Sequence, residues 1–187
     1  MTDLDERRRA EFPQYERPAY FGAMRPWRVA LLAEWMAPLA KARVKSYLDV
    51  GCGPAESLLI AEAFKIPIRR GCDVVESVCK HDVDLIPGVH DLSMYEDNQF
   101  DICSCHDVLE HILEEDVPSA LRELDRVTKT CVLLGISRKP GPFHICIQTE
   151  EWWLTKISQN MRGKAQVIFA DRIPKVKMPY VYVSVTC

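Results

Sequence analysis

The chain has 187 residues, of which 48% are hydrophobic and 27% are charged, and its formal net charge is −3. This length and composition predict one globular domain with a sizeable core. The net negative charge argues against a nucleic-acid partner, because phosphate binding usually requires a basic excess or patch. The N-terminus is charged, and no apolar run is long enough to span a membrane, so we expect a cytoplasmic protein without a membrane partner.

Eight cysteines are spread along the chain, and none of them forms a C-x-x-C pair. Most lie in apolar, strand-like stretches, including Cys103 and Cys105 on one predicted strand. Such residues usually behave as small buried hydrophobes in a reducing compartment. The sequence therefore predicts free thiols and no metal site.

The first 44 residues are predicted to form an N-terminal arm and a helix that packs on the domain formed by residues 45–187. Apolar residues recur at helical spacing from Pro26 to Leu39. Beyond them, strand-like and helical patterns alternate. Strands are predicted over 46–50, 66–72, 83–86, 100–105, 130–136, 165–170 and 180–186, and helices over 54–64, 117–128 and 150–158.

This alternation indicates an α/β fold with a doubly wound, mostly parallel sheet. The last two predicted strands are separated only by residues 171–179, which favours a closing hairpin with one antiparallel strand. The run 130–136 is apolar throughout, as expected of a strand buried on both faces.

A glycine turn follows the first predicted strand. Gly51 and Gly53 would let the backbone approach a ligand closely, and the next helix would present free N–H groups there. A dinucleotide site would have a third glycine where this chain has Glu56, and a glutamate would repel a pyrophosphate. Asp49, just before the turn, suits a ligand with a cationic amine, although the glycines could also serve only a tight turn.

A second acidic residue, Asp73, ends the next predicted strand. A carboxylate at that place can accept hydrogen bonds from both hydroxyls of a ribose. A solvated loop aspartate would be unremarkable on its own, but the combination with the glycine turn favours the ribose role.

Four motifs in order resemble the class I S-adenosylmethionine-dependent methyltransferase family, of the small-molecule type. They are L-D-V-G-C-G over 48–53, G-C-D-V-V-E over 71–76, H-D-L-S-M-Y-E-D-N-Q-F-D-I over 90–102 and S-C-H-D-V-L-E-H over 104–111. The resemblance covers about residues 46 to 136. It implies a Rossmann-like sheet of seven strands in the order 3-2-1-4-5-7-6, with strand 7 antiparallel.

The resemblance also implies a set of residues that bind S-adenosylmethionine. The loop from Asp49 to Gly53 would hold the methionine end, Asp73 with Val74 the ribose end, and Cys105 with His106 the region of the sulfonium. Gly88 stands where the family usually has an acid for the adenine amino group, which leaves the backbone at Val89 and His90 for that contact. The full predicted set is Asp49, Gly51, Cys52, Gly53, Asp73, Val74, Val89, His90, Cys105 and His106.

Two histidines are candidates for catalysis. His144 follows the fifth predicted strand, at the sheet edge where loops carry function, and could act as a general base. His106 lies beside the expected sulfonium. Glu110 and His111 recur in the family at a helix start, and we expect them to cap or brace the turn.

The predicted function is methyl transfer to an O or N atom of a small molecule. Residues 104–107 lack the prolines typical of amino-directed DNA enzymes, which disfavours a nucleic-acid substrate, and a protein substrate stays open. An alternative from a different functional class is a cofactor-binding protein or accessory subunit without transfer activity. A homodimer or a partner subunit that completes the site is also compatible with the sequence.

Overall fold

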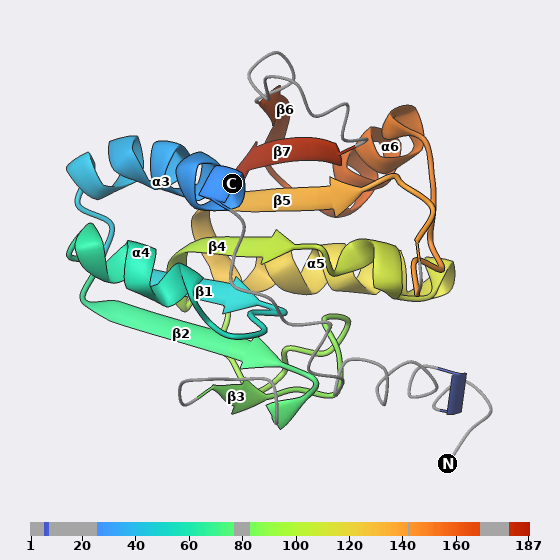
Figure 1. Cartoon of the computed structure of the whole chain (residues 1–187), viewed down its shortest axis with the longest axis horizontal. Helices are drawn as coiled ribbons and strands as arrows, with labels where there is room; N and C mark the ends of the chain where they lie inside the picture. Colours follow the sequence, from blue (N-terminus) through green and yellow to red (C-terminus); the bar gives the residue numbers. More distant parts are fainter. Residues whose placement is uncertain (1–5, 8–25, 77–82, 142, 169–179) are drawn as a thin grey trace.

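A single seven-stranded sheet organises the chain, with the strand order β3-β2-β1-β4-β5-β7-β6 (Figure 1). The computed structural model describes residues 6–7, 26–76, 83–141, 143–168 and 180–187. The strands are β1 (Ser46–Val50), β2 (Ile68–Asp73), β3 (Asp84–Leu85), β4 (Phe100–His106), β5 (Thr128–Ser137), β6 (Lys164–Ile168) and β7 (Tyr180–Thr186). The predicted fold class and strand order are confirmed.

Six strands run in one direction, and β7 is antiparallel to both of its neighbours. In the middle of the sheet, Asp49 of β1 pairs with Gly71 of β2 and with Ser104 of β4. The carboxyl ends of β1, β2 and β4 therefore meet at one edge. In open α/β sheets this edge, beside the point where the strand order reverses, is the usual ligand site.

Helices cover both faces of the sheet (Figure 1). Helices α3 (Pro26–Lys41) and α4 (Ser57–Ala63) lie on one face, and α5 (Val117–Val127) and α6 (Glu150–Asn160) lie on the other. Two short 3₁₀ turns, η2 (Leu109–His111) and η3 (Glu114–Asp116), connect β4 to α5. Helix α3 buries four apolar side chains against the sheet, namely Leu31, Leu32, Trp35 and Met36.

Element boundaries differ from the sequence expectation where the backbone turns. The helix predicted from residue 54 begins at Ser57, because Gly53 and Ala55 have positive φ angles of 50° and 57° and so cannot be helical. The strand predicted from residue 66 begins at Ile68, because the N–H of Ile66 bonds the carbonyl of Ala61 and closes the turn after α4. β4 continues to His106, so that Cys105 and His106 belong to the strand itself.

The seven cysteines that the structure describes are free thiols, and all of them except Cys187 are buried. Cys79 and most of the predicted N-terminal arm lie outside the described residues. Within the described ranges, no helix combines the length and the apolar character that a bilayer crossing requires.

Candidate functional site

The loop after β1 has a backbone conformation that would let a ligand approach closely. Gly51 has a φ of 69°, in the region that glycine adopts without cost. A Cβ at Gly51 would lie 2.2 Å from Cγ2 of Val108, which follows β4. The positive φ and the close approach together require glycine at this position.

Asp73 ties this loop to the end of β2. One carboxylate oxygen accepts a hydrogen bond from the backbone N–H of Gly53 at 2.8 Å, and the other accepts from the N–H of Val75 at 3.1 Å. The side chain is 8% exposed, and burial raises its pKa. A carboxylate oxygen can accept a second hydrogen bond, so Asp73 can hold the loop and still bind ligand hydroxyls.

Asp49 is buried at the end of β1, where its two carboxylate oxygens bond two hydroxyls. Ser104 of β4 donates to Oδ1 at 2.6 Å, and Ser57 at the start of α4 donates to Oδ2. Burial raises the pKa of Asp49 to about 6. The sequence analysis did not identify the two serines, because each is an ordinary residue until the fold brings it to the carboxylate.

The remaining predicted cofactor residues lie along the same sheet edge. Val74 directly follows β2, and Val89 and His90 lie in a loop after β3 that is closed by the hydrogen bond from the N–H of Asp91 to the carbonyl of Gly88 at 3.0 Å. Val89 is buried. Cys105 is also buried and packs in the core on the α5 side.

His106 ends β4 and turns its imidazole to the opposite face of the sheet. The ring lies 5.8 Å from the ring of Tyr182 between centroids, and neither ring nitrogen has a hydrogen-bond partner within the described part of the chain. Burial, and to a lesser degree the charge of Arg28, lowers the pKa of His106 to about 3. The imidazole is therefore neutral at physiological pH and presents one donor and one acceptor.

An ion pair joins α3 to the end of β4. The guanidinium of Arg28 bonds the carboxylate of Asp107, and both side chains are partly buried. Asp107 has a φ of 52°, and its N–H bonds the carbonyl of Gly135 at 2.9 Å. This contact fixes the beginning of α3 over the sheet edge, and sequence reasoning missed it because the two residues lie far apart in the chain.

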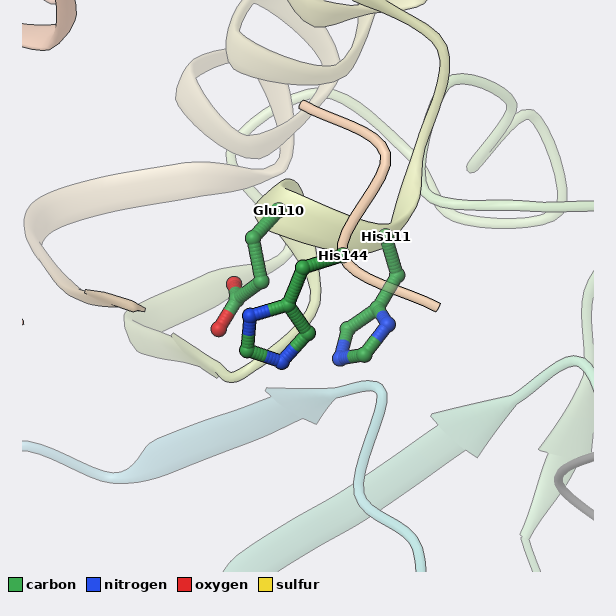
Figure 2. Close-up of side chains that lie close together, drawn as sticks. All are labelled: Glu110, His111 and His144. Carbon is green, nitrogen blue, oxygen red and sulfur yellow. The ribbon is translucent and has the colours of Figure 1, made fainter. Parts of the chain in front are cut away.

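The structure brings His144 to Glu110 and His111, from which it is distant in sequence (Figure 2). The rings of His111 and His144 meet edge to face with centroids 4.6 Å apart. Glu110 braces its turn as expected, since Oε1 accepts from the N–H of Ser137 at 3.0 Å. Burial raises the pKa of Glu110 to about 7 and lowers that of His111 to about 4.

Comparison with known proteins gives a family match over the core of this site. Residues 48–134 match the family described as "Methyltransferase domain". That segment holds the glycine loop, Asp73 and the end of β4. No curated protein gives a significant match to the sequence.

Solved structures share the fold at low sequence identity. Magnesium protoporphyrin IX methyltransferase from Synechocystis PCC 6803 has a TM-score of 0.65 and 14% identity, over 100% of this chain and 98% of that one. The 1,6-didemethyltoxoflavin-N1-methyltransferase of Burkholderia thailandensis has a TM-score of 0.63 and 14% identity, over 100% and 91% of the two chains. A SAM-dependent methyltransferase from Archaeoglobus fulgidus has a TM-score of 0.63 and 13% identity, over 85% and 94%.

Proposed function

The chain has the methyltransferase-domain sequence and the fold of the class I S-adenosylmethionine-dependent methyltransferases, and we propose that it transfers a methyl group to an O or N atom of a small molecule. The observation that carries the proposal is the hydrogen bond between Gly53 and Asp73. It unites the glycine loop and the strand-end carboxylate in one site.

The cofactor is S-adenosylmethionine. The loop from Gly51 to Gly53 would receive its methionine end, and the free lone pairs of the Asp73 carboxylate would bind its ribose hydroxyls. Glu56 stands next to this loop and would repel a pyrophosphate, which argues against a dinucleotide. The proposed cofactor residues are those inferred from the sequence.

The acceptor would approach from the face covered by α3. Aromatic rings gather there, with Trp27 of α3 lying 5.7 Å from Tyr180 and 6.5 Å from Tyr182 between centroids. Tyr180 and Tyr182 are stacked at 5.9 Å. Rings of this kind bind flat, partly apolar molecules well. They favour an acceptor with an aromatic or heteroaromatic portion.

Methyl transfer is an in-line displacement. A lone pair on the acceptor atom forms the new bond to the methyl carbon while the bond from that carbon to sulfur breaks, which leaves S-adenosylhomocysteine. Orientation supplies most of the rate in such a reaction. The residues that matter most are therefore those that hold the two reactants in line.

His106 suits the orienting role better than the role of a strong base. Its conjugate acid has a pKa of about 3 in the folded protein, so the buried ring is weakly basic, but it can bond an acceptor hydroxyl or amine. His144 is the proposed general base. It would take the proton that the acceptor hydroxyl or amine loses late in the reaction. Its Nδ1 lies 2.7 Å from the carbonyl of Lys139 and so donates to it, which makes Nε2 the basic nitrogen.

A small-molecule acceptor is supported by two further observations. The formal net charge is −3, without the basic excess that nucleic acids require. Two structural neighbours are named for small acceptors, magnesium protoporphyrin IX and 1,6-didemethyltoxoflavin. A cofactor-binding protein without transfer activity is the competing proposal, favoured by Gly88 at the position of the usual adenine acid.

An acceptor screen separates the enzyme from the binder. Purified protein would be incubated with S-adenosylmethionine and pools of phenols, heteroaromatic amines and carboxylic acids, and S-adenosylhomocysteine would be quantified by mass spectrometry. We expect at least one pool to raise product formation, and His106→Gln to reduce turnover by about 10-fold or more. If the protein binds the cofactor but no pool gives turnover, the result would favour a cofactor-binding protein without transfer activity. A requirement for a partner subunit would favour an accessory role.

A further inference from the structure

Glu110, His111 and His144 converge at the carboxyl ends of β4 and β5 (Figure 2). Each residue offers one ligand atom, and these three atoms lie within 4.8 Å of one another. Glu110 and His111 come from η2, whereas His144 comes from the loop after β5. The methyl-transfer scheme above uses only His144, as a base in the protein without a bound metal ion.

Both histidines are oriented by backbone carbonyl groups. Nδ1 of His111 lies 2.9 Å from the carbonyl oxygen of Phe143, and Nδ1 of His144 lies 2.7 Å from that of Lys139. A carbonyl can only accept, so Nδ1 carries the proton in each ring and Nε2 is the basic nitrogen. Metal-binding histidines are typically held in this tautomer by such a second contact.

Glu110 supplies an anionic oxygen that the protein does not otherwise use. The residue is 0% exposed, and its Oε1 accepts from the N–H of Ser137. The other oxygen, Oε2, is buried and has no hydrogen-bond partner among the residues that the structure describes. A buried carboxylate oxygen without a partner is costly, and a cation removes that cost.

The backbone around the cluster is also fixed. The carbonyl oxygen of Glu110 accepts from the N–H groups of Ile145 at 2.9 Å and Cys146 at 3.0 Å. These bonds join η2 to the segment that carries His144. Main-chain hydrogen bonds thus fix the backbone that carries the donors, in addition to the contacts of the side chains.

We infer that Glu110, His111 and His144 bind one divalent transition-metal ion. Two imidazoles and one carboxylate are the donors of mononuclear Zn²⁺ sites that keep an open position, and also of open Fe²⁺ sites. Zn²⁺ is the ion that we expect, because it needs no more than these three ligands and a water molecule. No metal was expected from the sequence, where only the cysteine spacing was considered, and His144 is far from the other two donors in the chain.

The site would face the acceptor side of the sheet edge. His111 and His144 are partly exposed while Glu110 is buried, so the open coordination position points toward solvent. A metal ion there can polarise or orient a bound oxygen atom. This functional role rests on the proposed methyl transfer, whereas metal binding itself does not.

A tag-free preparation of the full chain tests the inference, since a histidine tag would bind metal by itself. The protein would be dialysed against a chelator, reloaded with Zn²⁺, desalted and measured by inductively coupled plasma mass spectrometry. We expect about one Zn²⁺ per chain. We also expect Co²⁺ loading to give visible d–d bands, a readout that requires neither cofactor nor turnover.

Variants distinguish this site from adventitious binding. His144→Gln removes a partly exposed ligand and is expected to weaken Zn²⁺ binding by about 100-fold or more, since losing even a supporting contact costs 10-fold to 100-fold. Glu110→Gln should do the same, and its thermal melt reports whether the buried site still folds. His90→Gln removes a histidine from another loop as the matched control and should retain the metal. Absence of stoichiometric Zn²⁺, or equal binding by wild type and His144→Gln, would overturn the inference, whether or not the protein methylates anything.

Discussion

Oδ2 of Asp73 lies 2.8 Å from the backbone nitrogen of Gly53, so the end of β2 holds the loop that follows β1. The same carboxylate accepts from the N–H of Val75 at 3.1 Å. The residue inferred to bind the cofactor ribose therefore also determines the shape of the neighbouring loop. We therefore expect folding and cofactor binding to be coupled at this side chain.

Removal of this carboxylate should destabilise the fold even without cofactor. Asp73→Ala leaves two backbone N–H groups without their acceptor, and we expect the free energy of unfolding to fall by about 2 to 4 kcal/mol. Asp73→Asn keeps one carbonyl oxygen and should lose about half as much. Urea unfolding measures both, with exposed Glu62→Gln as the control. Wild-type stability in Asp73→Ala would show that the two bonds do not support the loop.

Substitution of Gly51 tests the close approach of the glycine loop to the chain that follows β4. In Gly51→Ala the Cβ would lie 2.2 Å from Val108, at a φ of 69° that alanine adopts at a cost. We expect a loss of about 2 kcal/mol in unfolding free energy, of which Val108→Ala in the same chain restores only the steric part.

The matched control for Gly51 is Gly141→Ala, whose Cβ would lie 3.4 Å from its nearest neighbour, the ring of His144. This substitution should change the free energy of unfolding by less than about 0.5 kcal/mol. Equal effects at the two glycines in thermal or urea unfolding would mean that the loop tolerates a side chain at Gly51.

The Arg28–Asp107 ion pair can be measured by a double-mutant cycle. Arg28→Met keeps most of the side-chain volume, and Asp107→Asn suits the positive φ of that position. Because both partners are partly buried, we expect a coupling of about 1 kcal/mol in unfolding free energy. Each single variant should also raise the KM for the acceptor. Strict additivity of the two substitutions would show that the contact does not anchor α3.

The pH dependence of stability reports the environment of Asp49. The folded-state pKa of Asp49 is raised from 3.8 to about 6. Its contribution to the free energy of unfolding is therefore complete below about pH 4 and is lost as the pH rises through 6. The unfolding free energy of wild type relative to Asp49→Asn should therefore fall over this range, by about 3 kcal/mol at most. Urea titrations at several pH values measure the difference. A constant difference would mean that Asp49 ionises in the fold as it does in water.

The parts of the site that could be predicted are those encoded by neighbouring residues. The strand, glycine turn and acidic residue around Asp49 and Gly51 form one continuous segment, and their pattern carries both local geometry and chemistry. Strand order came from the resemblance to a known family, because periodicity alone predicts strands but not their neighbours in the sheet. The structure confirms that order.

Contacts between distant segments could not be predicted in the same way. Arg28 is an ordinary helix residue until α3 lies over Asp107, and Ser104 gains its role only beside Asp49. His144 was predicted as a candidate base in a loop, but its approach to Glu110 depends on the course of the chain after β5. Patterns in a single sequence do not indicate which distant residues meet, because the packing of the whole sheet determines these contacts.

Calorimetric titration of S-adenosylmethionine into wild type and Asp73→Ala tests the central claim most directly. The account predicts micromolar binding to wild type and at least a 10-fold loss in Asp73→Ala, measured at a temperature where both proteins are folded. S-adenosylhomocysteine should bind to the same site and compete. No binding of either compound to folded wild type, or equal affinity in Asp73→Ala, would contradict the account.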